Sequence, residues 1–214
     1  MLTAKSRTPA KRASARSRTR PTAPRAETAA RLAAEIERLN AELAALRAKV
    51  AELEARADID PLLDIANRRG FERELRRALS FVRRYGTQAA VIYLDLDGLK
   101  PVNDRHGHAA GDAVLKAVAT TLTSHVRDSD TVARLGGDEF AVLLWNLGRR
   151  QAAAKAEALE ALIAAAKIAW GKAILTVGAS AGIATISPLD EAAAVLATAD
   201  EAMYARKAER KRRR

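Results

Sequence analysis

The chain has 214 residues, of which 49% are hydrophobic and 29% are charged, so most of it can fold around one or two cores. It contains no cysteine, which excludes disulfides and thiolate metal sites and is typical of a reducing cytoplasm. The chain opens without the apolar run of a signal peptide. It also holds no run of about 18 uncharged apolar residues that would span a membrane, so we expect a cytoplasmic protein.

The net charge of +11 is concentrated at the two ends of the chain. Residues 1–25 carry +8 and residues 206–214 carry +6, which leaves −3 for residues 26–205. Such tails suit contact with nucleic acid or an anionic membrane surface; the alternative is a solvated tail that only keeps the chain soluble. Residues 1–26 are rich in Ser, Thr, Ala, Pro and Arg without apolar periodicity, which predicts a disordered basic tail.

The next segment, residues 27–57, has the heptad pattern of a coiled-coil dimerisation helix. Its apolar residues recur at alternating steps of four and three: Leu32, Ile36, Leu39, Leu43, Leu46, Val50 and Leu53. β-Branched residues at two of the three a positions, with Leu at d, favour a parallel two-stranded coil and hence a homodimer. The alternative is a single amphipathic helix that packs on its own domain, but the narrow a/d stripe favours the coil.

Residues 58–211 are predicted to form a second, α/β domain that begins near the helix-breaking Pro61. Apolar spacing predicts helices and strands in alternation: helices over 71–85, 112–126, 151–169 and 191–206, and strands over 89–94, 131–135, 140–145 and 174–186. The mixture, which includes a hairpin, predicts a central mixed sheet flanked by helices.

Asp95 ends the short apolar strand 89–94, and ligands of α/β sheets bind beyond the carboxyl ends of strands. We expect Asp97 on the opposite side of this strand, so that Asp95 needs a metal-binding partner from elsewhere in the chain. Calcium-loop spacing is excluded because Leu99 stands where a fifth-position Asp or Asn is required.

A turn between the two hairpin strands supplies that partner. It reads Gly136-Gly137-Asp138-Glu139, and its glycines permit a positive φ and a close approach of a ligand. Two acids at a hairpin tip, beside a strand that ends in another acid, form a site for a hard divalent cation. Magnesium prefers a few carboxylates together with water and substrate phosphates. A glycine turn with acids can equally be only a turn.

Together these residues resemble the GGDEF family, the diguanylate cyclases. The five-residue signature, 136–140, is intact, and the resemblance extends over about residues 58–211. Further matching runs are 95–100 (DLDGLK), 102–104 (VND), 107–112 (GHAAGD) and 199–204 (ADEAMY) followed by Lys207. The resemblance implies a ferredoxin-like, palm-type domain that condenses two GTP into cyclic di-GMP and releases two pyrophosphates.

The resemblance also implies a metal and catalytic set. Asp95, Asp138 and the backbone carbonyl of Leu96 would bind Mg²⁺, with Mn²⁺ as an alternative. Glu139 would help to hold the metal or to remove a proton, and Lys100 would neutralise phosphate charge beside Asp138 and Glu139.

The implied GTP-binding set comprises Leu99, Asn103, Asp112, Gly136, Gly137 and Lys207. A carboxylate at Asp112 can accept from the guanine N1–H and N2–H groups, and the Asn103 amide can both donate and accept. The glycines would let the nucleotide lie against the turn, and Lys207 would neutralise its phosphates. Asn103 as a turn cap and Lys207 as a solvated cation are the alternatives.

Arg127 and Asp130 resemble the family's allosteric product-inhibition site, and five residues separate Asp130 from Gly136. An Arg there can hold a phosphate or stack on guanine. The reaction joins two GTP, one held by each domain, so the predicted coil would supply the second domain at high local concentration.

The chain departs from the family pattern at a few positions. Leu63-Asp64 replaces the usual Thr-Gly near the start of the domain, which predicts a reshaped turn, and Leu99 replaces an aromatic residue. Arg210-Lys211 replaces Gly-Arg after Lys207. These changes leave a second hypothesis open, a catalytically inactive receptor or adaptor that binds cyclic di-GMP or GTP.

Overall fold

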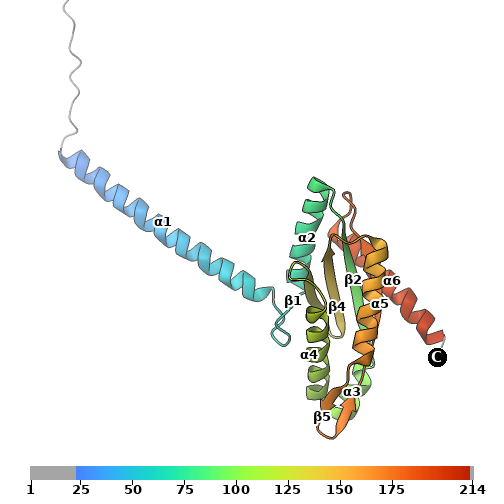
Figure 1. Ribbon diagram of the computed structural model, residues 1–214. Coiled ribbons are helices and arrows are strands. Elements are labelled where there is room, and N and C mark those ends of the chain that lie inside the picture. Colours follow the sequence, from blue (N-terminus) through green and yellow to red (C-terminus); the bar gives the residue numbers. More distant parts are fainter. Residues whose placement is uncertain (1–22, 213–214) are drawn as a thin grey trace, which may run out of the picture. The chain divides into compact units, whose positions relative to one another are not determined.

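The structure is a computed structural model that describes residues 23–212 (Figure 1). Residues 1–22, most of the predicted basic tail, and residues 213–214 lie outside the described residues. The chain divides into two compact units, Met1–Ala51 and Glu52–Arg214, which we treat separately. Within the described residues, no helix is both long enough and apolar enough to cross a membrane.

Helix α1 (Ala23–Ala57) consists almost entirely of strong helix formers. Arg38 pairs with Glu35 one turn before it at 2.7 Å and with Glu42 one turn after it at 3.4 Å, which supports the helix locally. The side chains of Leu32, Ile36, Leu39, Leu43, Leu46 and Val50, here called the apolar stripe of α1, are all 44–59% exposed. The helix therefore presents a row of apolar side chains at coiled-coil spacing to its surroundings.

The second unit contains a five-stranded sheet in the order β1-β3-β4-β2-β7. Its strands are β1 (Ala66–Asn67), β2 (Ala89–Asp97), β3 (Thr131–Gly136), β4 (Glu139–Trp145) and β7 (Gly178–Thr185). The β1–β3 pair is parallel and all other pairs are antiparallel, so the predicted mixed sheet is confirmed. The helices are α2 (Arg68–Tyr85), α3 (Leu99–His106), α4 (His108–Ser124), α5 (Arg149–Ala165) and α6 (Ala192–Arg212).

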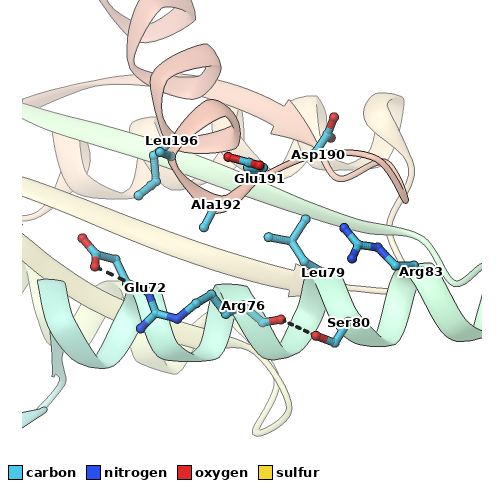
Figure 2. A pocket seen from close by; sticks show the side chains of 10 residues that line it. Glu72, Arg76, Leu79, Ser80, Arg83, Asp190, Glu191, Ala192 and Leu196 are labelled. Atoms are coloured by element: carbon cyan, nitrogen blue, oxygen red, sulfur yellow. Dashed lines mark hydrogen bonds and ion pairs between the residues drawn. The ribbon is translucent and has the colours of Figure 1, made fainter.

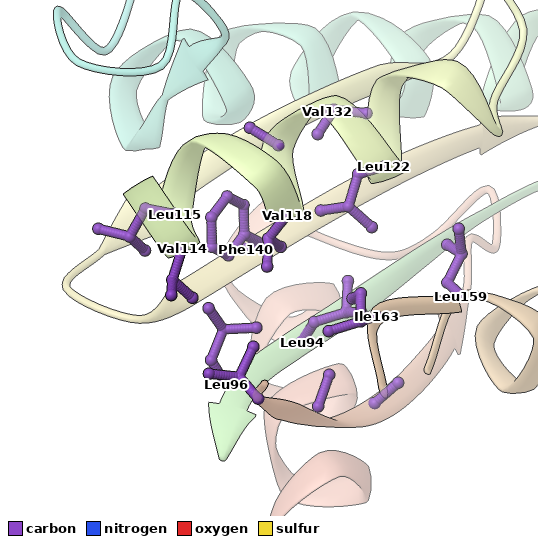
Figure 3. Close-up of a cluster of buried hydrophobic side chains, with 14 of the residues drawn as sticks. Leu94, Leu96, Val114, Leu115, Val118, Leu122, Val132, Phe140, Leu159 and Ile163 are labelled. Carbon is purple, nitrogen blue, oxygen red and sulfur yellow. The ribbon is translucent and has the colours of Figure 1, made fainter. Parts of the chain in front are cut away.

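Side chains alternate between the two faces of central strand β2 and thereby build two cores. Val91 and Tyr93 join a cluster with residues of α2 and α6, whereas Ile92 and Leu94 join a cluster with residues of α4 and α5. Figure 3 shows the second cluster, in which Val114, Val118 and Leu122 of α4 lie against the sheet and Phe140. Helices thus cover both faces, as the predicted fold class requires.

The sequence prediction missed a short hairpin and a helix, and it joined two separate strands into one. The predicted helix 151–169 ends at Ala165, and residues 168–170 form β5 (Ile168–Trp170), which pairs with β6 (Ala173–Leu175) across Gly171, whose φ is 57°. The alanine-rich composition concealed this hairpin. The predicted strand 174–186 is split between β6 and β7. Helix α3 was not predicted, although its Pro101 lies in the first turn, where proline is tolerated.

Helix α6 packs closely on β7 because residue 182 is glycine. A Cβ atom added to Gly182 would lie 2.1 Å from the carbonyl oxygen of Ala199 and 2.1 Å from the backbone nitrogen of Met203. Both contacts are with helix backbone, which cannot turn aside as a side chain can. Gly182 therefore sets the distance between α6 and the sheet, and with it the position of every residue that α6 carries past Met203.

We expect Gly182→Ala to lower the free energy of unfolding by about 3 kcal/mol, since a group forced into a packed core costs about 1–3 kcal/mol and the backbone here cannot yield. Denaturant unfolding of the purified protein measures it. Gly178→Ala in the same strand is the matched control, because its nearest contact would be the Asp97 Cβ atom at 3.4 Å. Equal effects of the two substitutions would contradict the close approach at Gly182.

Candidate functional site

The carboxyl end of β2 places two acids on one face of the sheet. Asp95 stands opposite Glu139 of β4 and opposite Ser180 of β7. The expectation that Asp97 points away from Asp95 was wrong, because residues two apart on an extended strand share a face. The Ser180 hydroxyl donates to Asp97 Oδ2 at 2.9 Å, and Lys207 contacts both acids.

The turn of residues 136–139, here called the acidic turn, is fixed from both sides. Gly137 has a φ of 24°, as the glycine pair predicted, and its carbonyl accepts from Arg134 Nε at 3.1 Å and Nη2 at 2.8 Å. Arg134 Nη1 also donates to Asp60 Oδ2 at 3.3 Å. The backbone N–H of Leu96 donates to the Asp138 carbonyl at 3.1 Å, so the turn is joined to the end of β2.

The Leu96 carbonyl points toward the same turn. In an extended strand the N–H and C=O groups of one residue face the same neighbouring strand. Since the Leu96 N–H is bonded to Asp138, its C=O also faces the acidic turn. Asp95, the Leu96 carbonyl and Asp138 therefore lie at one place in the fold, although they come from two separate segments.

The surroundings of Lys207 indicate a strong negative potential at the end of β2. Its ammonium is hydrogen-bonded to Asp95 Oδ1 and lies 3.7 Å from Asp97 Oδ1. Burial alone lowers the pKa of Lys207. The hydrogen bond and charge of Asp95, followed by the charges of Asp97 and Asp138, nevertheless bring that pKa above its ordinary value. A protein cation thus contacts two carboxylates and is stabilised further by the charge of a third, Asp138.

Glu139 lies in a different environment from Asp138. Its Oε2 atom is 3.5 Å from Arg68 Nη2, and Arg68 also donates from Nε to the Leu135 carbonyl at 3.0 Å. Burial, the charge of Glu139 and a hydrogen bond to it raise the pKa of Tyr93 to about 12, with a smaller contribution from Asp200. Tyr93 therefore stays protonated at neutral pH, and Glu139 is partly neutralised by Arg68.

These donors suit a hard divalent cation that is shared with a ligand. Within the described part of the chain, no three Asp, Glu, His or Cys side chains form a metal cage on their own. Magnesium is commonly held by one or two carboxylates with water and substrate phosphates completing the shell, so such a cage is not required. The ammonium of Lys207, held by Asp95 and attracted by Asp138, indicates that a cation is favoured there.

A pocket of about 450 Å³ adjoins the acidic turn, and most of the predicted nucleotide-binding residues line it. Asn103 and Asp112 contribute from α3 and α4, with Leu99, Lys100, Gly137 and Asp138 also in the lining. The Asn103 Oδ1 atom is buried without a hydrogen-bond partner among the described residues. Five predicted residues of the metal and nucleotide sites do not line this pocket: Asp95, Leu96, Gly136, Glu139 and Lys207.

Arg127 and Asp130 lie together in the turn before β3. The two Asp130 carboxylate oxygens accept from the backbone N–H groups of Arg127 and Trp145, each at 3.0 Å. The Arg127 side chain is exposed. Asp130 therefore holds the turn in place, and the Arg127 guanidinium is the group that remains accessible to a ligand.

In the turn at the start of the domain, Asp64 has a backbone conformation that glycine favours. Asp64 has a φ of 55°, in the left-handed region that Asp tolerates better than most residues. Its N–H donates to the Asp60 carbonyl at 3.0 Å, and Asp60 Oδ1 accepts from the N–H groups of Leu62 and Leu63. Asp64 thus adopts a conformation that glycine also adopts readily, and the reshaping of this turn stays a prediction.

The sequence analysis placed Asp97 wrongly and missed three supporting residues, Arg68, Arg134 and Ser180. Asp97 could have been found from its spacing of two from Asp95. Arg68, Arg134 and Ser180 carried no local signal, because each acts on a segment distant in sequence.

A second hollow, of about 550 Å³, lies between α2 and the start of α6 (Figure 2). Both arginines and acids line it, among them Glu72, Arg76 and Glu191, and none of the predicted site residues does.

Comparisons with known proteins agree with this geometry. The family model described as "Diguanylate cyclase, GGDEF domain" matches residues 57–213. The chain is 41% identical over 152 residues to the probable diguanylate cyclase DgcE of Escherichia coli K12, covering 71% of this chain and 14% of DgcE. It is equally 41% identical over 152 residues to the diguanylate cyclase TpbB of Pseudomonas aeruginosa PAO1, covering 70% of this chain and 35% of TpbB.

Solved structures show the same likeness. The crystal structure of the coiled coil and GGDEF domain of DgcB from Caulobacter crescentus in complex with c-di-GMP matches with a TM-score of 0.71 and 28% identity. That match covers 83% of this chain and 95% of the other. The chain spans well under half the length of the two curated relatives named above. With the family model matched over most of its length and the signature turn beside Asp95, the chain belongs to the GGDEF family, the diguanylate cyclases.

Proposed function

We propose that this chain is a diguanylate cyclase that condenses two GTP into cyclic di-GMP with magnesium, or alternatively manganese, as cofactor. In each half-reaction the 3′-hydroxyl of one GTP attacks the α-phosphorus of the other, and the bond to the β-phosphate breaks to release pyrophosphate. The observation that carries the proposal is the contact of the Lys207 ammonium with Asp95 and Asp97 at the end of β2, next to the turn whose Asp138 lines a pocket of about 450 Å³.

Asp95, Asp138 and the Leu96 carbonyl would hold the metal. When bound, the metal polarises the phosphoryl oxygens and lowers the pKa of the attacking hydroxyl. Arg68 holds the Glu139 side chain at the acidic turn, where Glu139 would hold an outer water or accept the hydroxyl proton. Its partial neutralisation by Arg68 limits the repulsion between Glu139 and Asp138.

The pocket residues would orient the nucleotide. Asp112 and Asn103 face the same pocket from neighbouring helices, where a guanine edge can bond to both. Lys100 lines that pocket and can reach a phosphate. Lys207 already contacts Asp95, so phosphates gathered at Asp95 would lie within reach of its ammonium.

The test is GTP turnover by the purified protein with magnesium, with products separated chromatographically. We expect cyclic di-GMP and pyrophosphate, and we expect Asp138→Ala to lower turnover more than about 100-fold while the protein stays folded. Even outer-shell partners of metal ligands cost about 10–100-fold, so a direct ligand should cost more. The control is Glu201→Ala, at an exposed acid of α6, which should keep full activity.

Two outcomes would redirect the proposal. Full activity of the Asp138→Ala variant would overturn the metal assignment. A folded, dimeric wild-type protein that binds cyclic di-GMP but never converts GTP would instead support the receptor function.

The apolar stripe of α1 supports a homodimer, which the reaction needs because each domain holds a single GTP. Burying such a stripe against a second copy removes apolar surface from water at about 25 cal/mol per Å². A coil would also keep the second domain at an effective concentration near the millimolar range. Dimerisation through α1 is therefore part of the proposal.

We expect Leu39→Glu, which places a charge in the stripe, to yield a monomer by analytical ultracentrifugation. Its cyclic di-GMP production should fall at least about tenfold at low protein concentration and recover as concentration rises, because encounter becomes bimolecular. Ala41→Glu, off the stripe on the same helix, is the matched control and should stay dimeric. A dimeric and fully active Leu39→Glu variant would show that another surface joins the domains.

Product inhibition through Arg127 and Asp130 is also proposed, and the geometry separates the two residues. Arg127→Ala should relieve inhibition by cyclic di-GMP without changing stability, because the exposed guanidinium holds nothing in the fold. Asp130→Ala should relieve inhibition and also lower the free energy of unfolding by about 1–3 kcal/mol, since two backbone N–H groups lose their acceptor. Inhibition curves and thermal unfolding measure the two effects. Unchanged inhibition in the Arg127→Ala variant would remove this site.

The N-terminal basic tail lies largely outside the described residues, whereas residues 206–212 of the C-terminal basic segment belong to α6. Contact of either segment with nucleic acid or an anionic membrane stays a prediction. Phosphate contacts would make such binding weaken steeply with salt.

A further inference from the structure

Helix α5 carries a buried acid that the proposed reaction does not use. Glu160 is 8% exposed. Its Oε1 atom accepts from the backbone N–H of Ala181 at 2.7 Å, and its Oε2 atom accepts from Arg206 Nη2 at 3.0 Å. A buried carboxylate is costly unless it is paired and hydrogen-bonded, so these partners account for its presence.

Two arginines one helical turn apart on α6 converge on this acid. Arg206 makes the hydrogen bond described above, and Arg210 Nη1 lies 3.8 Å from Glu160 Oε1. Arg210 also donates to the backbone carbonyl of Ala179. The C-terminal part of α6 is thereby joined both to α5 and to the edge strand β7.

These attachments lie level with the carboxylate that Lys207 contacts. Ala179 and Ala181 flank Ser180 in β7, and Ser180 stands directly opposite Asp95 in β2. Lys207 lies between Arg206 and Arg210 in sequence, so the helical turn that is held at the edge of the sheet is the one that directs the ammonium to Asp95.

Apolar packing alone cannot hold the helical turn of α6 that carries Lys207. The last buried apolar residue of α6 among those described is Met203, one turn before Lys207. Helix ends fray, and fixing a lysine side chain costs up to about 2 kcal/mol of conformational entropy. Beyond Met203, the Glu160–Arg206–Arg210 network is what restrains the helix. Arg210 stands where the matching family pattern has glycine, so this restraint includes a residue in which the chain departs from that pattern.

We propose that Glu160 is a positioning residue for Lys207, acting through Arg206 and Arg210. The expected effect on turnover rests on the proposed cyclase function, in which Lys207 contacts the phosphates. The expected effect on the position of the Lys207 ammonium beside Asp95 does not depend on that function.

The variant to test is Glu160→Gln, which keeps the side-chain volume and an acceptor for the Ala181 N–H but removes the charge that holds both arginines. The matched control is Glu157→Gln, because Glu157 meets the same Arg206 at 3.5 Å with a side chain 64% exposed. Exposed ion pairs contribute little, so the control should behave as wild type. Arg210→Met is the second variant, since it leaves Glu160 paired with Arg206 if Glu160→Gln fails to fold.

The first measurement needs no turnover. The side-chain ammonium signal of Lys207, assigned by its loss in Lys207→Met, is recorded by ¹⁵N NMR. We expect it to be sharp and slow to exchange in wild type and in Glu157→Gln, and broadened in Glu160→Gln and Arg210→Met. An unchanged signal in both of the latter variants would overturn the proposal, whether or not the protein makes cyclic di-GMP.

The second measurement is a double-mutant cycle on kcat and KM for GTP. Glu160→Gln should lower kcat/KM about 10–100-fold, as removal of supporting partners does. In the Lys207→Met background it should cost little more, because its effect runs through Lys207. Full additivity, or a lower Tm with unchanged kinetics, would mean a purely structural role. A wild-type protein without turnover would count against the cyclase and leave the NMR measurement to decide this inference.

Discussion

The pairing of strand β2 with β4 on one side and β7 on the other is the constraint on which the site depends. The register places Asp95 opposite Glu139 and Ser180 at the same time. The hairpin that carries the acidic turn thus reaches Asp95 from one side, and the strand on which α6 packs reaches it from the other. A one-residue slip of β4 or of β7 would turn Glu139 or Ser180, respectively, to the face of the sheet opposite Asp95.

The negative charge of the clustered carboxylates is balanced by cationic side chains. These side chains come from elements that are distant in the sequence. Lys207 of α6 meets Asp95 and Asp97, Arg68 of α2 meets Glu139, and Arg134 of β3 holds the carbonyl of Gly137. Each cation is itself fixed by a second partner or by a close helix–sheet contact. The acidic turn is therefore held in a shape that tolerates high negative charge, which a site for a divalent cation and phosphates requires.

The proposed reaction needs a nucleotide-binding site and a second copy of the domain. The pocket would supply the first, and the apolar stripe of α1 would bring the second. The pocket beside Asp138 is proposed to hold one nucleotide, and the proposed product, built from two GTP, would need two such pockets to face each other. The exposed stripe offers a means of bringing a second copy near without adding any residue to the pocket itself. The proposed catalytic groups and the proposed dimerisation surface thus lie in separate segments of the chain.

Local patterns in the sequence determined the features that need only neighbouring residues. The heptad stripe, the apolar central strand ending in Asp95 and the two-glycine turn before Asp138 are all readable in short windows, and the structure has each of them. The β5–β6 hairpin was missed because alanine-rich composition favours helix, and this preference hid the short strands.

Tertiary structure alone decided which distant groups meet. Lys207 and Asp95 are 112 residues apart, and the contact exists because Gly182 lets α6 lie close to the sheet. Asp130, predicted as a ligand group, is also committed to the backbone of Trp145 fifteen residues away. Glu160 resembles any other acid of a helix in the sequence, and only the packing of α5 against β7 and α6 buries it. These contacts are determined by how the helices pack on the sheet. A sequence pattern cannot predict them because it contains no distances between elements.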